Sequence, residues 1–131
     1  MPDVLGVIIC DGIRQENNGK LILVGVYTGT MIVQQFAFGT ELAMAAILGE
    51  RTEKISRVKL RVGTTGGAEF VDGDFALPEP QWVSVDQTLI PLPPVPVVFS
   101  TPDVLEVRIG LNGGEERLVG RLKIERGVIP S

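Results

Sequence analysis

The stretch VLGVIICDGIRQENNGKLILVGVY, residues Val4–Tyr27, decides the fold class of this chain. Its first part, Val4–Cys10, is a short apolar run rich in branched residues. It favours a buried strand, because it is too short for a stable helix. Residues 20–27 form a second apolar run, and between the two Asp11–Lys20 predicts a polar loop that turns at Asn18-Gly19. Two such runs predict neighbouring strands at the centre of a sheet.

Three later segments also have strand patterns. Ile55–Val62 alternates between apolar and basic residues, which predicts a strand with one buried face. Gly39–Gly49 is rich in alanine, which favours a helix, but the glycines that bound it lead us to expect a strand. Met31–Val33 predicts a short strand before it.

The C-terminal part predicts a hairpin. Apolar residues alternate from Leu105 to Leu111, and they return after the turn Asn112-Gly-Gly114. On the returning strand we expect Leu118, Leu122 and Ile124 all to face the core.

Prolines and glycines interrupt the remaining segments. Ala68–Leu77 predicts a strand with a bulge at Gly73, where the alternation slips. Pro78–Gln81 predicts a stiff loop, followed by a strand over Val83–Ile90. Pro91–Pro96 predicts a polyproline-like connector or edge segment, because proline has no N–H to donate to a central ladder.

Many short strands with turns at regular spacing indicate an all-β fold. We predict one domain over residues 1–131, an antiparallel two-sheet sandwich of about eight or nine strands that is immunoglobulin-like in general architecture. A chain of this length can bury one adequate core without disulfides.

Composition restricts the chemistry. The 131 residues include no histidine and a single cysteine, Cys10. A Ser-His-Asp, Cys-His or histidine-ligated zinc site within the chain is therefore excluded, as is an intramolecular disulfide. Without a histidine base, Cys10 is best interpreted as a small buried hydrophobe. We expect a non-enzymatic protein without a cofactor.

Charge and hydropathy bear on partners and location. The net charge of −4 at pH 7 disfavours nucleic acid as a partner. A mean hydropathy of +0.27 indicates a large core or a surface covered by a protein partner, either itself or another protein. No segment approaches the roughly 20 apolar residues that span a bilayer. We therefore expect no membrane partner and a location in the cytoplasm, or in a particle assembled there.

The densest polar cluster, Asp11, Arg14, Gln15 and Glu16, is the candidate site. One interpretation is a recognition loop in which Arg14 binds an anion or a carboxylate. The interpretation that we favour is a structural clasp, in which Asp11 pairs with Arg14 and fixes the loop to the first strand. A third hypothesis is an enzyme that uses Asp11, Arg14 and Glu16, which requires a concave site at the loop.

Four acidic residues, Glu69, Asp72, Asp74 and Glu79, are the candidate cation site. Carboxylate oxygens suit calcium, but their spacing differs from that of a twelve-residue EF-hand loop, and an Asp-Gly turn explains them equally well. Paired carboxylates also serve in glycosidases, yet such pairs are common on protein surfaces.

Basic side chains recur on two predicted strands: Arg57, Lys59 and Arg61, then Arg117, Arg121 and Lys123. They would suit nucleic acid, but aromatic residues for base stacking are scarce. In a hairpin Glu106 lies opposite Arg121 or Lys123, which favours a solvated sheet face with cross-strand ion pairs.

Trp82, close to Pro80 and ahead of the proline run 91–96, has two interpretations. It is a docking surface for a peptide or a small ligand, or it packs on prolines of its own chain, which we favour.

The motif Cys10-Asp11-x-x-Arg14-Gln15-Glu16, followed by Asn18-Gly19-Lys20 and Gly25-Val26-Tyr27, resembles an uncharacterised family of small bacterial and phage-associated proteins. The resemblance covers roughly the first 30 and the last 30 residues. The family has a second acidic residue where this chain has Gly12, which weakens a metal or acid–base role for the loop. The resemblance implies a β-sandwich and carries no activity and no functional residues.

We therefore predict a non-enzymatic protein-binding or structural module. One alternative is a structural component of a virion or another assembly. Another is a β-sandwich that binds a small molecule or a carbohydrate through Trp82 and nearby carboxylates.

Overall fold

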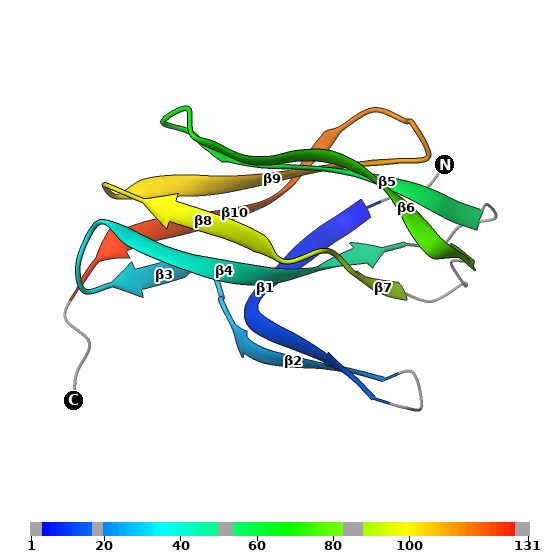
Figure 1. Cartoon of the computed structure of the whole chain (residues 1–131), viewed down its shortest axis with the longest axis horizontal. Coiled ribbons are helices and arrows are strands. Elements are labelled where there is room, and N and C mark those ends of the chain that lie inside the picture. Colours follow the sequence, from blue (N-terminus) through cyan, green and yellow to red (C-terminus); the bar gives the residue numbers. More distant parts are fainter. Residues whose placement is uncertain (1–3, 17–19, 50–53, 83–87, 128–131) are drawn as a thin grey trace.

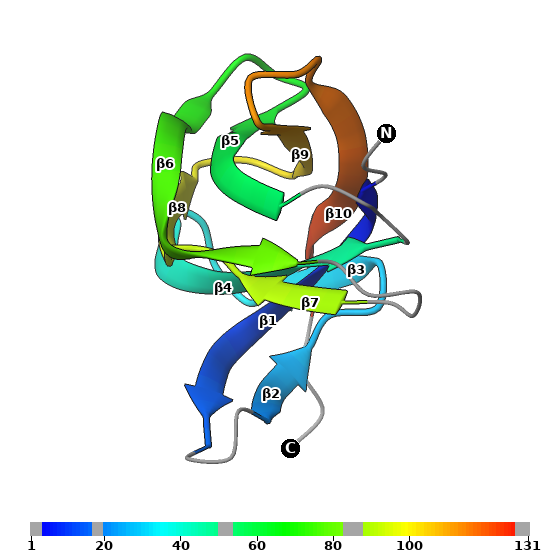
Figure 2. The ribbon, with the colours of Figure 1, turned by 90° about the vertical axis from the view of Figure 1, so that its right-hand side faces the viewer.

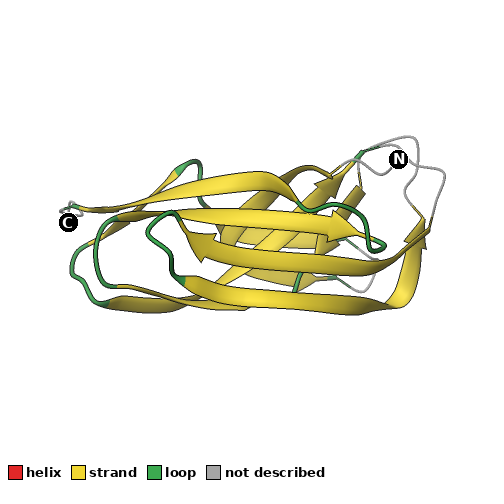
Figure 3. Cartoon of the chain, turned by 90° about the horizontal axis from the view of Figure 1, so that it is seen from above, coloured by secondary structure: helices red, strands yellow, loops and turns green. Residues whose placement is uncertain are grey.

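The computed structural model describes residues 4–16, 20–49, 54–82 and 88–127. These residues form strands and loops without a helix (Figure 3). The ten strands within them are β1 (Val4–Gln15), β2 (Leu21–Val26), β3 (Thr30–Val33), β4 (Phe38–Leu48), β5 (Lys54–Thr64), β6 (Glu69–Trp82), β7 (Thr88–Pro91), β8 (Val95–Phe99), β9 (Asp103–Leu111) and β10 (Arg117–Arg126). No helix in this described part is long and apolar enough to cross a membrane.

The strands form two sheets that face each other (Figures 1 and 2). The first has the order β2-β1-β4-β7, with β8 also paired to β4, and the second has the order β3-β10-β9-β5-β6. The predicted two-sheet sandwich is confirmed, with ten described strands in place of eight or nine. One pair departs from the antiparallel expectation, because β3 runs parallel to β10. The immunoglobulin-like topology stays a prediction.

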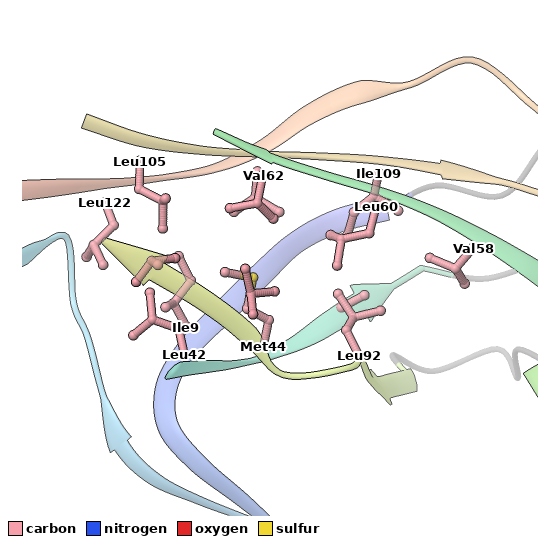
Figure 4. Packing of buried hydrophobic residues seen from close by; sticks show 14 of the residues in the cluster. Ile9, Leu42, Met44, Val58, Leu60, Val62, Leu92, Leu105, Ile109 and Leu122 are labelled. Atoms are coloured by element: carbon pink, nitrogen blue, oxygen red, sulfur yellow. The ribbon is translucent and has the colours of Figure 1, made fainter. Parts of the chain in front are cut away.

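One hydrophobic cluster fills the space between the sheets (Figure 4). The alternation predicted for β5 is confirmed, since Val58, Leu60 and Val62 point inward and are almost fully buried. Gly39–Gly49 contains a strand as predicted, and its Met44 faces Val62 of β5 across the core, while Leu42 lies on the side of Leu105 and Leu122 (Figure 4). Alanine favours a helix only weakly, and strand pairing on both sides of β4 outweighs that preference.

The opening hairpin differs from the prediction. The segment Asp11–Gln15 is not a loop; it continues β1, and its residues Gly12–Gln15 pair with Leu21–Val24 of β2. β1 leaves β4 after Cys10, so the hairpin projects beyond the two sheets (Figures 1 and 2). β2 is therefore an edge strand, not a central one. We call residues 11–15 and 21–26 the arm.

β6 also runs further than predicted. Pro78–Gln81 lies within the strand, but the pairing with β5 is irregular there. Ala76 pairs with Arg57 and Gln81 pairs with Ile55, so β6 has more residues than β5 between these two pairs. Two prolines without N–H groups account for this bulge. The bulge expected at Gly73 is absent, since Gly73 pairs regularly with Leu60. The lack of a side chain at Gly73 instead leaves room for the ring of Phe75, because a Cβ at position 73 would lie 2.9 Å from that ring.

The proline-rich segment forms the far edge of the first sheet. β7 and β8 follow each other along β4, and the N–H of Leu92 between them donates to the carbonyl of Met44 at 2.9 Å. The prediction of an edge segment at Pro91–Pro96 is confirmed. Of the strand predicted over Val83–Ile90, the part from Thr88 belongs to β7, and residues 83–87 lie outside the described part of the chain.

One residue of the terminal hairpin was predicted wrongly. Leu122 and Ile124 are buried, but Leu118 is 40% exposed. The β9–β10 register shifts between Leu118 and Gly120, so the extra residue Val119 reverses the faces on which its neighbours lie. The turn is as predicted: Asn112 and Gly113 have positive φ, and the N–H of Gly114 donates to the carbonyl of Leu111.

Candidate functional site

Asp11 stands at the base of the arm, where β1 leaves β4. Its Oδ1 accepts a hydrogen bond of 2.5 Å from the hydroxyl of Tyr27, just beyond the end of β2. Gly25, with a φ of +69°, makes room for this carboxylate, because a Cβ there would stand 2.3 Å from Asp11 Oδ2. The two ends of the arm are thus held together by a carboxylate and a phenol.

The predicted pairing of Asp11 with Arg14 is not found among the described ion pairs. The two residues are three positions apart on one strand, so their side chains leave it on opposite faces. Arg14 and Gln15 are exposed on the outer half of the arm, opposite Ile22 and Leu21. The clasp hypothesis is therefore wrong about the partner of Asp11, which is Tyr27 and not Arg14.

Glu16 takes part in the arm through its backbone. Its N–H donates to the carbonyl of Lys20 at 2.8 Å and closes the described end of the hairpin. The turn predicted at Asn18-Gly19 lies outside the described residues. Asp11, Arg14 and Gln15 thus lie on one strand of the arm and Glu16 directly follows it, without converging on one point.

Titration of Tyr27 tests the link at the base of the arm. Burial raises the pKa of Tyr27, and the hydrogen bond and negative charge of Asp11 raise it further, to about 12. Tyr27 is the single tyrosine, so phenolate absorbance reports on it alone. We expect Asp11→Asn to move the midpoint toward the ordinary value near 10. Circular dichroism over the same pH range shows whether the chain stays folded, and an unchanged midpoint in the folded variant would contradict the assignment.

The same shift makes stability depend on pH. The pKa of Tyr27 is higher in the folded than in the unfolded chain, so its contribution is complete below about pH 10. It is lost as the pH rises toward 12. We expect Asp11→Asn to flatten this part of the stability profile.

Apolar side chains cover both faces of the arm. Ile22, Val24 and Val26 are 41%, 47% and 47% exposed. The other face carries Leu23 beside its cross-strand partner Ile13, with Leu21 next to them, and these three are only partly buried. None of the six belongs to the hydrophobic cluster between the sheets or packs against it. The arm therefore presents apolar surface that the fold does not use.

The sequence contains a signal for this arm that the prediction missed. In the structure Gly12–Gln15 of β1 pair with Leu21–Val24 of β2. An apolar residue, Ile13, lies between the polar ones, as it does in a strand with alternating faces. Polarity alone led to the loop prediction, although an edge strand can be polar at alternate positions.

Two pockets lie elsewhere, at the turn between β5 and β6. One of about 370 Å³ opens beside Arg61 and Arg108, and one of about 170 Å³ lies beside Thr64 and Asp103. No arm residue lines either pocket. The concave site required for an enzyme built on Asp11, Arg14 and Glu16 is therefore not provided by these pockets.

The basic residues of β5 are paired across the outer face of the second sheet. Lys59 Nζ lies 3.0 Å and Arg61 Nη1 3.3 Å from the carboxylate of Glu116, and Arg57 Nη2 lies 3.3 Å from Asp74. A hydrogen bond from Lys59 is the main cause that lowers the pKa of Glu116. These contacts support the solvated, ion-paired interpretation of this stripe.

The second basic stripe is paired in the same way. Arg121 Nε lies 3.4 Å from Glu106, its register partner, and Arg108 approaches the same carboxylate to 3.6 Å. Lys123 lies 2.7 Å from Glu125. The cross-strand pair predicted between Glu106 and one of the two basic residues is thus confirmed for Arg121.

The acidic residues do not converge on a cation site within the described part of the chain. Asp74 pairs with Arg57, and Asp72 stands in register with Arg61. No group of three or more acidic or cysteine side chains among the described residues is arranged to hold a metal ion. The side chains of Glu79, Pro80 and Trp82 lie outside the described residues.

Cys10 is fully buried. Its Sγ contacts the carbonyls of Gly12 at 3.4 Å and Ala43 at 3.6 Å. Burial is the main cause that raises the pKa of the Cys10 thiol, so less of it is thiolate near neutral pH. These contacts are those of a packing residue.

No protein-family model matches the chain, and a search of curated proteins finds no similar sequence. The resemblance to the family of small bacterial and phage-associated proteins stays a prediction.

Proposed function

We propose that this protein is a non-enzymatic binding module that contacts other protein through its arm. The observation that supports the proposal is the set of six apolar side chains on the arm, outside the hydrophobic cluster. Exposed apolar surface at one projecting element is typical of a protein-binding site.

The energetics of the arm support the same proposal. A two-stranded hairpin is marginally stable by itself in water, and larger sheets or packing against another element are needed for independent stability. Here the arm is attached at its base by β1 and by the bond between Tyr27 and Asp11. A protein partner that covered either face of the arm would add the packing that the chain itself does not supply.

Site-specific photocross-linking tests the proposal. We place a photoreactive phenylalanine analogue at Val24 on the arm, and at Val98 on β8 as the matched control, since Val98 is 58% exposed. In the cells that produce the protein we expect a cross-linked protein from position 24 and none from position 98. A second substitution, Ile22→Lys, should abolish the product. Equal products from both positions, or none from position 24, would contradict the proposal.

A further inference from the structure

The edges of the two sheets differ in their protection against strand pairing. Free sheet edges in monomeric proteins are usually guarded by prolines, charges, bulges or short length. The β7–β8 edge carries four prolines, Pro91, Pro93, Pro94 and Pro96, and the β6 edge carries Glu69, Asp72, Asp74, Pro78 and Pro80. β3 is four residues long.

Among these described edges, β2 is the one that lacks such protection. Its six residues, LILVGV, contain no charge and no proline. The other edge of the arm, formed by β1 from Asp11 to Gln15, carries Asp11 and Arg14. Among the described residues no strand pairs with the outer edge of β2, and Figure 2 shows the arm projecting from the two sheets.

The hydrogen-bond pattern identifies which residues of β2 face outward. Glu16 and Lys20 form a bonded pair, and bonded pairs alternate along an antiparallel ladder. Ile22 and Val24 thus bond to β1, while the N–H and C=O of Leu21 and Leu23 point to the open edge. Gly25, with its φ of +69°, departs from strand geometry and ends this regular stretch.

We propose that β2 pairs with β2 of a second copy of this chain, antiparallel, with the two-fold axis at Leu23. This rests on the proposed function and names its partner. With the axis at Leu23, the N–H and C=O of Leu23 form two hydrogen bonds with the C=O and N–H of Leu23 in the second copy. This axis sets Leu23, an outward-facing residue near the middle of β2, opposite its own copy.

Side-chain complementarity favours an identical partner. On one face the pairing creates the continuous row Ile13, Leu23, Leu23 and Ile13 across the two copies. On the other face it sets Ile22 beside Val24 of the second copy. On the face of Leu23, Leu21 falls opposite Gly25, which has no side chain. The paired segments are uncharged, so two chains of net charge −4 meet without like charges in contact.

The contact is small, which determines the behaviour we expect. β2 contributes six residues from each copy, whereas a standard interface uses roughly 20–30 residues on each side. The dimer should therefore be reversible and depend on concentration.

Sedimentation velocity over a concentration series tests self-association. We expect wild type to form dimers as its concentration rises, Val24→Lys to weaken the dimer at least tenfold, and the control Val98→Lys to behave as wild type. Wild type that is monomeric up to its solubility limit, or a dimer that Val24→Lys leaves intact, would overturn the proposal. If that monomer still cross-links a different protein from position 24, the binding function stands and only the identity of the partner is wrong.

A disulfide experiment tests the position of the axis. Partners in a bonded antiparallel pair have Cα atoms about 5.5 Å apart, which a disulfide can bridge. Leu23→Cys should therefore oxidise to a covalent dimer. In Leu21→Cys, the control, the two thiols lie four residues apart along the ladder and should not join. Cys10 is buried in both variants. Cross-linking of Leu21→Cys in preference to Leu23→Cys would contradict the assigned axis.

Discussion

Leu122→Ala is expected to lower the free energy of unfolding by about 2–5 kcal/mol, the range for deleting a large buried aliphatic side chain. Leu122 is 1% exposed and lies among the residues between the sheets (Figure 4). Leu118→Ala on the same strand is the matched control, since Leu118 is 40% exposed, and it should cost less than about 1 kcal/mol. Urea unfolding of the two variants measures both values.

This comparison tests the bulge at Val119. If β10 ran without a bulge, Leu118 and Leu122 would be on the same face and both substitutions would be costly. Equal losses of stability would therefore contradict the β9–β10 register described above. A large loss for Leu122→Ala alone would support it.

Gly120→Ala should be the second most damaging substitution. A Cβ at position 120 would stand 2.3 Å from Cγ1 of Val7 on β1, so the two sheets are in close contact there. Overpacking of this kind costs about 1–3 kcal/mol. Gly12→Ala is the control, because nothing lies within 4 Å of a Cβ at Gly12.

A double-mutant cycle separates this contact from other effects of the substitution. Val7→Ala removes the atom that the new Cβ meets. In the Val7→Ala background we therefore expect Gly120→Ala to cost at least about 1 kcal/mol less than in wild type. The same cost in both backgrounds would show that Val7 is not the obstacle and would contradict the close approach of β1 to β10.

The sequence predicted those strands whose side chains alternate against one core. From Val58 to Val62 in β5 and from Leu105 to Leu111 in β9 each second residue is apolar and most residues between them are charged, so the face buried against the other sheet could be read directly. The prediction failed at Leu118, where one extra residue in the strand reverses the faces. Gly120, an isolated glycine within the strand pattern, is the local signal that marks this bulge, and the prediction did not use it.

The candidate site was only partly predictable for a related reason. The cluster from Asp11 to Glu16 was identified as the distinctive segment, and it does lie on the arm. Its role was assigned by assuming that polar residues form a loop. The apolar residues of β2 were assigned to the core because composition does not distinguish a central strand from an unguarded edge. Only the pairing of strands in space shows that β4 does not continue alongside the arm.

Amide hydrogen exchange at Leu23 tests most directly whether the arm associates through its free edge. In dilute protein the N–H of Leu23 should exchange rapidly, while that of Val24, bonded to β1, should be slower. As the concentration rises, exchange at Leu23 should slow and exchange at exposed loop amides should not change. Exchange at Leu23 that is the same at every concentration would contradict pairing of β2 with a second copy.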